Sequence, residues 1–213
     1  MNRKIQNDRE IALGILKPSK KHLDKGLSIH KEAVVWDDYG FAPVAPIDGD
    51  ILRREIESGA SSKEIQDMCE EMMMTGYLRN EKIQKEYIKA WEESGVTCVM
   101  QNAGQEGNSV NRLLKRLARF TWATDILKPH IKKVISPEEV VSAKKENAHC
   151  LCFSGNGVPL PGEFNSVEEE LNYIRIFYQL GIRMMHLTYN RRNLIGDGCA
   201  EPADAGLSDF GKS

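Results

Sequence analysis

The stretch Leu180-Gly-Ile-Arg-Met-Met-His-Leu-Thr-Tyr-Asn-Arg-Arg-Asn193 indicates the fold class of this chain. It follows an amphipathic helical segment, reads as a β-strand and ends in polar residues. A loop that contains Asp197-Gly-Cys199 comes next. In α/β proteins, residues at the carboxyl ends of parallel strands bind substrates and cofactors. The stretch therefore predicts a strand whose functional residues lie at its carboxyl end.

Three earlier apolar runs have the same character, because each is short and is followed by polar residues or glycine. Short bounded runs of this kind are typical of buried parallel strands. The expected strands, in chain order, are residues 33–36, 96–100, 149–153 and 180–193.

Helical segments separate these strands, and several begin with a capping signal. Ser61-x-x-Glu64 and Ser166-x-x-Glu169 are capping boxes. Ser136-Pro137 places serine at an N-cap and proline at the first helical position. One-sided apolar patterns predict further helices near residues 51–59, 83–95 and 109–126.

The alternation of strands and helices predicts a parallel sheet with right-handed crossovers. Polar or glycine clusters follow all four strands, and no G-x-G-x-x-G turn follows the first, which favours a barrel over an open doubly wound sheet. A full barrel has eight strands in typically about 250 residues. We therefore expect an α/β TIM-type (β/α)8 barrel with only its first four β/α units present. Residues 1–32 are expected to form an N-terminal helical segment, and residues 33–213 the first half of the barrel, ending at the fourth helix.

The composition predicts a soluble globular protein without a nucleic-acid or membrane footprint. A formal net charge of -2 gives no basic surface. No run approaches the roughly 20 apolar residues of a membrane span. The cysteines are odd in number and scattered, so we expect a cytoplasmic, thiol-reduced protein. Cys150 and Cys152 are expected to be small buried residues rather than a metal clip.

The carboxyl ends of the four expected strands supply hydrogen-bonding groups and two guanidinium groups. Arg191 and Arg192 suit a substrate carboxylate or phosphate, the alternative being surface charges in a loop. His186, inside the expected strand, is more often a satisfied interior residue than a ligand. A metal site built only from these strand ends would depend on aspartates, which suit hard cations better than zinc. The strand-end residues are Asp37, Asp38, Tyr39, Gln101, Asn102, Ser154, Asn156, Tyr189, Asn190, Arg191, Arg192 and Asp197.

The segment Tyr178-Gln-Leu-Gly-Ile-Arg-Met-Met-His-Leu-Thr-Tyr-Asn190, with Gly206-Leu-x-x-Phe-Gly211 after it, resembles the membrane (renal) dipeptidase family of zinc metallopeptidases. Residues 33–43 lie where that family has its first metal-binding strand. The resemblance covers residues 25 to 213. It implies a (β/α)8 barrel that hydrolyses dipeptides with a hydroxide activated between two metal ions.

Aligned on that family, this chain differs at four functional positions. Tyr39 and Phe41 stand where the family has a metal-binding histidine and aspartate. Ser154 replaces its bridging glutamate, and Tyr189 replaces a histidine that helps to hold the substrate. Phenylalanine cannot ligate zinc, and serine is a poor substitute for a bridging carboxylate. The resemblance therefore implies a divergent member, whose zinc or other divalent metal has its main ligands beyond residue 213, with Asp37 a weak candidate ligand.

The leading hypothesis is a dipeptidase-like, metal-dependent hydrolase of dipeptides, of which this half barrel alone is expected to be inactive. Tyr39, Ser154 and Tyr189 are its candidate catalytic residues. Its candidate substrate-binding residues are Asn102, Asn190, Arg191, Arg192 and Asp197.

Two other readings stay open. The first is a catalytically inactive barrel that binds a small molecule or peptide. The second, a lysine-dependent lyase or aldolase, ranks last because none of the four strand ends carries a lysine. In either case the half barrel would have unpaired edges, so we expect it to aggregate or to form a homo-oligomer.

Overall fold

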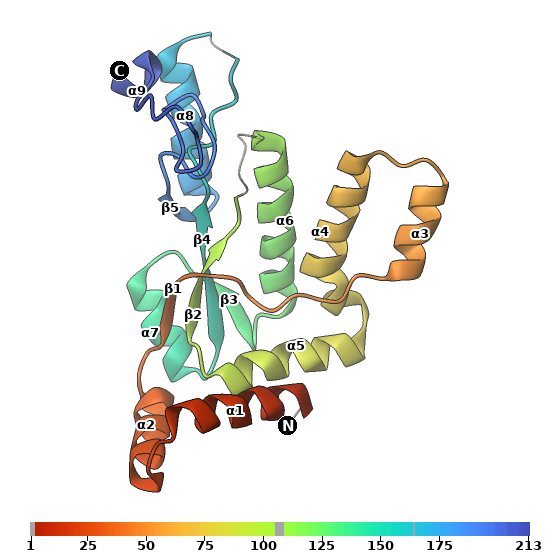
Figure 1. Cartoon of the computed structure of the whole chain (residues 1–213), viewed down its shortest axis with the longest axis vertical. Coiled ribbons are helices and arrows are strands. Elements are labelled where there is room, and N and C mark those ends of the chain that lie inside the picture. Colours follow the sequence, from red (N-terminus) through yellow and green to blue (C-terminus); the bar gives the residue numbers. More distant parts are fainter. Residues whose placement is uncertain (1–2, 105–108, 164) are drawn as a thin grey trace.

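In the computed structural model, a parallel sheet runs through the centre of the chain and helices pack around it (Figure 1). The structure describes residues 3–104, 109–163 and 165–213. Residues 1 and 2 of the expected N-terminal segment lie outside the described residues. The helices are α1 (Arg3–Leu16), α2 (Lys20–Glu32), α3 (Gly49–Glu57), α4 (Ser62–Arg79), α5 (Glu81–Ser94), α6 (Val110–Ile126), α7 (Pro137–Lys145), α8 (Val167–Gln179) and α9 (Asp209–Lys212).

The helix starts agree with the capping signals. The Ser61 side chain accepts from the N–H of Glu64, and the Glu64 carboxylate accepts from the N–H of Ser61 at 2.8 Å. Ser136 and Ser166 cap α7 and α8 in the same way through their hydroxyl oxygens. Gly95 ends α5 with a φ of 67°, a conformation that glycine adopts without strain. These helices were predictable because each signal is local in the sequence.

The strands depart from the sequence predictions at their ends. They are β1 (Trp36–Gly40), β2 (Cys98–Asn102), β3 (Ile131–Lys133), β4 (His149–Gly155) and β5 (Ile182–Met185). The first two begin and end later than the expected ranges 33–36 and 96–100, so polar residues that were expected in the following loops belong to the strands. The fourth expected strand, residues 180–193, is wrong beyond Met185, where the chain folds back as a loop. β3 was not expected at all.

The order of the strands is β1-β2-β4-β3, and β5 also pairs with β4. β3 lies beside the first half of β4, with Ile131 opposite His149, and β5 lies beside the second half, with Phe153 opposite Ile182. The four expected strands are therefore neighbours in chain order, as in a barrel. β3 is an additional strand on the same side of β4 as β5.

Helices cover both faces of this sheet. Val99, Leu151 and Phe153 share a core with α6 and α8. The alternate residues Cys98, Cys150 and Cys152 share a second core with α7, as period-two alternation along a strand requires. Figure 1 accordingly shows α6 and α7 on opposite sides of the strands.

The chain path explains these opposite sides. The connection from β2 to β3 passes beyond β4, and the connection from β3 to β4 returns. Right-handed crossovers in opposite directions place their helices on opposite faces. The parallel α/β class is confirmed, whereas an arrangement of exactly four barrel units is not, because β3 and α7 depart from it.

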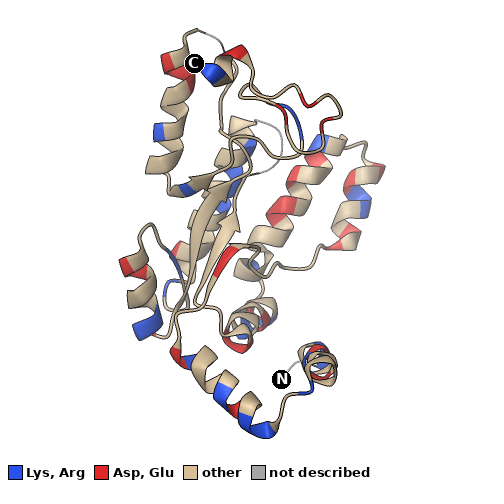
Figure 2. Cartoon of the chain, turned by 60° about the vertical axis from the view of Figure 1, so that its left-hand side comes forward, with Lys and Arg blue, Asp and Glu red and all other residues tan. Residues whose placement is uncertain are grey.

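The surface carries both signs of charge. Figure 2 shows acidic and basic residues interspersed along the helices, whereas β2 and β4, at the centre of the sheet, contain neither. α1 and α2 contain no buried residue and lie together at one end of the molecule. Within the described ranges, no helix is both long enough and apolar enough to cross a membrane. Cys150 and Cys152 are buried free thiols, as expected.

Candidate functional site

Tyr39 lies where the carboxyl ends of three neighbouring strands meet. Its hydroxyl donates a hydrogen bond to Oδ1 of Asn156, directly after β4. The same oxygen accepts a hydrogen bond from Nδ2 of Asn102, the last residue of β2, at 3.1 Å. One phenol therefore connects β1, β2 and β4 at the edge where α/β proteins place their sites.

Two further rings complete this group from the segment after β5. The rings of Tyr39 and His186 meet edge to face, with centroids 5.5 Å apart, and those of His186 and Tyr189 lie 5.8 Å apart. His186 directly follows β5, which ends at Met185, and its N–H donates to the carbonyl of Gly155 at 3.2 Å. We define the strand-end cluster as Tyr39, Asn102, Ser154, Asn156, His186 and Tyr189.

Three polar atoms of the cluster are buried without a hydrogen-bond partner among the described residues. They are Oδ1 of Asn102, Oγ of Ser154 and Nε2 of His186. Asn102 and Ser154 are direct partners in the β2–β4 register, so both side chains lie on one face of the sheet. An unsatisfied buried polar group costs about 1–3 kcal/mol. Three such atoms around one tyrosine suit a small polar ligand. His186 therefore differs from the satisfied interior residue that the sequence suggested only in that its Nε2 has no partner among the described residues.

The central phenol of the cluster is uncharged at neutral pH. Burial raises the pKa of Tyr39, so its hydroxyl stays protonated and can donate at neutral pH. No carboxylate or guanidinium group belongs to the cluster. Its chemistry is hydrogen bonding.

The loop after β5 uses other candidate residues for its own structure. Arg192 pairs with Asp197 at 2.6 Å, and Asp197 also accepts from the N–H of Ala205 at 2.5 Å. The carbonyl of Asn190 accepts from the N–H of Ala200 at 2.9 Å. Arg191 is exposed. For Arg192 and Asp197 the geometry favours a structural role in the loop.

The expected metal position has unsuitable donors. Asp37 is exposed on β1, and its carboxylate packs against Gly40 of the same strand. Phe41, 68% exposed, lies beside Tyr39 with ring centroids 6.3 Å apart. Among residues 3–104, 109–163 and 165–213, no three His, Cys, Asp or Glu residues are grouped to hold a metal ion. One imidazole and neutral oxygens do not fit a two-zinc centre.

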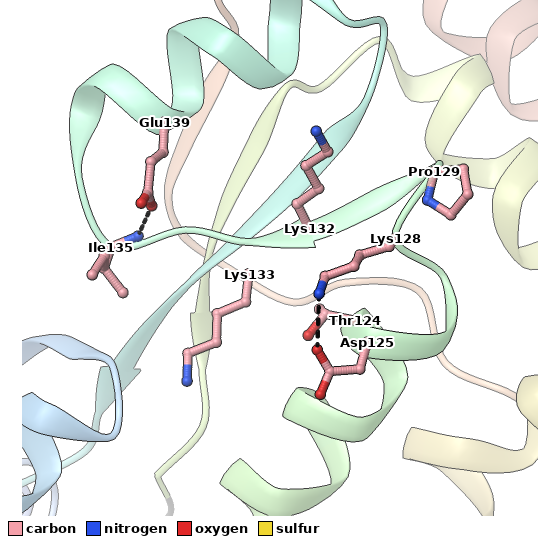
Figure 3. A pocket seen from close by; sticks show the side chains of 8 residues that line it. All are labelled: Thr124, Asp125, Lys128, Pro129, Lys132, Lys133, Ile135 and Glu139. Carbon is pink, nitrogen blue, oxygen red and sulfur yellow. Dashed lines mark hydrogen bonds and ion pairs between the residues drawn. The ribbon is translucent and has the colours of Figure 1, made fainter.

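A pocket to which no cluster residue contributes is shown in Figure 3. It is formed where α6 leads into β3 and β3 into α7, beside the first half of β4. Its lysines already have partners: Lys128 pairs with Asp125 at 3.8 Å, Lys132 pairs with Glu146, and Lys133 donates to the carbonyl of Leu180 at 2.7 Å. Burial lowers the pKa of Lys133. We do not place the functional site here.

Comparison with known proteins gives a family match over most of the cluster. The family model of membrane dipeptidases (Peptidase family M19) matches residues 78–213. That range includes every cluster residue except Tyr39. No curated protein matches the chain.

Solved structures show a similar fold at low identity. A probable dipeptidase, PvdM from Pseudomonas aeruginosa, is 12% identical with a TM-score of 0.58, over 92% of this chain and 46% of that one. An amidohydrolase from Pseudomonas aeruginosa is 17% identical with a TM-score of 0.52, over 87% and 43% of the two chains. A dipeptidase described as a metallopeptidase of family M19 is 13% identical with a TM-score of 0.50, over 84% and 51%. This chain therefore spans about half the length of these proteins.

Proposed function

Since this chain belongs to the membrane dipeptidase family, we propose that its strand-end cluster is the hydrogen-bonding wall of a dipeptide-binding site in a dipeptidase-like hydrolase. The observation that carries the proposal is the set of three buried, unpartnered polar atoms around Tyr39. A peptide unit offers one N–H donor and one carbonyl acceptor. Oδ1 of Asn102 can accept the donor, while Oγ of Ser154 or Nε2 of His186 can donate to the carbonyl.

Tyr39 and Tyr189 have different roles in this proposal. The hydroxyl of Tyr39 is already bonded to Asn156 and Asn102, so it orients Asn102 rather than reaching the ligand freely. Tyr189 is 36% exposed and faces His186, so it is the phenol that can meet a ligand. Exposed Arg191 is the guanidinium that we propose for a ligand carboxylate. Asn190 and the Arg192–Asp197 pair hold the loop that presents Tyr189.

Metal dependence is a separate proposal. The residues of the cluster do not fit a zinc pair, so we derive no step through a metal from them. The proposal of zinc or another divalent ion as cofactor therefore rests on the family membership alone. The cytoplasmic location also stays a proposal, supported by the five free thiols.

A non-catalytic binding barrel is the second candidate. It is favoured because Tyr39 and Phe41 occupy the positions where the family resemblance expects metal ligands, and because the cluster contains no carboxylate. It predicts affinity for small peptides without turnover.

The test is to measure binding and hydrolysis of alanyl-alanine by the protein, together with its metal content. Hydrolysis that disappears with a chelator and returns with zinc supports the metal-dependent hydrolase. Hydrolysis that survives complete metal removal contradicts metal dependence. Binding without hydrolysis supports the second candidate, and absence of both overturns the proposed site. Ser154→Ala and His186→Ala should weaken binding about tenfold each, whereas the exposed control Ser58→Ala should not.

A further inference from the structure

Arg116 of α6 reaches from the helix to the end of β2. Its Nε donates to the carbonyl of Ala103 at 2.7 Å, and Nη2 lies 3.4 Å from the carbonyl of Asn102. Arg116 is only 9% exposed, so these bonds lie inside the protein. A guanidinium group that binds two successive carbonyls fixes the direction of both peptide units.

Further hydrogen bonds hold this strand end. The N–H groups of Ala103 and Gly104 donate to the carbonyl of Ser154 at 2.9 and 3.3 Å. The side chain of Gln101 donates to the carbonyl of Asn102 at 3.0 Å. Ala103 and Gly104 are thus held to β4 through their N–H groups, and Asn102 and Ala103 are held to Arg116 through their carbonyls. Little freedom remains for the backbone that carries the Asn102 side chain.

Glu70 of α4 supplies the counter-charge for this buried guanidinium group. Glu70 is 3% exposed, and its Oε1 lies 3.0 Å from Nη1 of Arg116. Arg112 and Arg119 also pair with Glu70. Burial lowers the pKa of Arg116, and Glu70 opposes that effect. A buried charge needs such a partner, because an isolated ion is strongly disfavoured away from water.

We propose that Arg116 is a positioning residue of the strand-end cluster: it holds the peptide units of Asn102 and Ala103 so that Nδ2 of Asn102 points at Tyr39 and Oδ1 stays available to a ligand. Glu70 is its counter-charge. The ligand part of this inference rests on the proposed function, and the geometric part does not.

The neighbouring Arg119 provides a matched control. It pairs with Glu71 at 2.6 Å, Asp67 at 2.8 Å and Glu70 at 3.5 Å, and its side chain is 11% exposed. These partners all lie on α4. Replacing Arg119 therefore removes ion pairs between α4 and α6 without removing a bond to β2.

The experiment compares Arg116→Met, Arg116→Lys and Arg119→Met by amide hydrogen exchange. The amides of Ala103 and Gly104 should exchange about tenfold faster in Arg116→Met, since one charge-assisted hydrogen bond is worth about that factor. In Arg119→Met, the ratio of the exchange rates of these two amides to those of the α6 amides should be the same as in the wild-type protein. Equal acceleration in both variants would show a general loosening and overturn the proposal.

Arg116→Lys covers the case in which Arg116→Met does not fold. A single ammonium group can stay paired with Glu70 but cannot bind both carbonyls. Faster exchange at Ala103 and Gly104, with α6 unaffected, supports the positioning role. Unchanged exchange in Arg116→Lys overturns it.

Binding of alanyl-alanine separates this inference from the proposed function. Arg116→Met should bind about tenfold more weakly than Arg119→Met. Equal affinity in the two variants contradicts a role in ligand binding. If the wild-type protein does not bind the dipeptide, the proposed function fails, while the exchange rates still decide whether Arg116 positions β2.

Discussion

At the scale of single residues, Tyr39 joins three strands through one hydroxyl group. Phenylalanine keeps the ring and its contact with His186 but removes the hydrogen bonds to Asn156 and Asn102. We expect Tyr39→Phe to lower the free energy of unfolding by about 1–2 kcal/mol, because two side-chain amides lose a buried partner. Urea denaturation measures the change. Tyr178→Phe, at a residue that is 56% exposed, should change stability by less than about 0.5 kcal/mol.

Tyr39→Phe should also change how the stability of the protein depends on pH. Burial raises the pKa of Tyr39 above its unfolded value of about 10. The folded state therefore favours the protonated phenol, and this contribution is complete below about pH 10 and is lost as the pH rises through the folded pKa. The stability of the wild-type protein should fall more steeply above pH 10 than that of Tyr39→Phe. Parallel alkaline curves would contradict the assignment.

The sequence predicted which residues gather at the site better than it predicted their roles. Tyr39, Asn102, Ser154 and Tyr189 were identified as strand-end residues, and the structure brings them together. The position of His186 at the end of β5 was missed because strand periodicity alone does not reveal where a strand stops. The Glu70–Arg116 pair could not be found either, since it joins distant segments and each residue looks like an ordinary helical surface charge in sequence.

At the scale of elements, the helices were predictable and the strands less so. The serine caps of α4, α7 and α8 act within four residues. β3 was not predicted because its three residues, Ile131-Lys-Lys133, have no apolar pattern. Asp37 and Asp38 were expected in a loop. They lie in β1 instead, because an edge strand tolerates exposed charges.

The loop after β5 depends on a glycine without room for a side chain. A Cβ at Gly198 would lie 2.5 Å from N of Arg191 and from the carbonyl oxygen of Tyr189. We expect Gly198→Ala to lower the free energy of unfolding by about 1–3 kcal/mol through this overlap, as overpacking does. The altered loop should also be cut faster by trypsin at Arg191 and Arg192.

Gly49→Ala is the matched control, because nothing lies within 4 Å of a Cβ at the start of α3. It should leave stability unchanged or raise it slightly. Equal losses in the two variants would mean that the close approach at Gly198 does not constrain the loop.

At the scale of the whole molecule, the described sheet has two open edges of different charge. β1 carries Asp37 and Asp38, while β3 on the opposite side carries Lys132 and Lys133. Such charges limit edge pairing between like edges. Lys132 also pairs with Glu146, but an ammonium group has three donors, so pairing of unlike edges stays electrostatically favourable and supports the proposed self-association of this chain.

We therefore expect the protein to associate with rising concentration and to dissociate as salt is added, because screening weakens exposed charge pairs. Sedimentation velocity measures both. Asp38→Lys should weaken association, whereas Asp50→Lys, a change of equal charge on α3, should not. A monomer at all concentrations, with one cooperative unfolding transition, would contradict the proposal.

The position of β4 also affects how the chain folds. β4 pairs with β3 and β5, which flank it closely in sequence, and with β2, which is more distant. Closing a short loop costs less entropy than closing a long one. Residues 131–185 can thus assemble around β4 early, and β2 and β1 join a preformed ladder later. Core changes in β4 should slow folding, whereas changes in β1 should mainly speed unfolding.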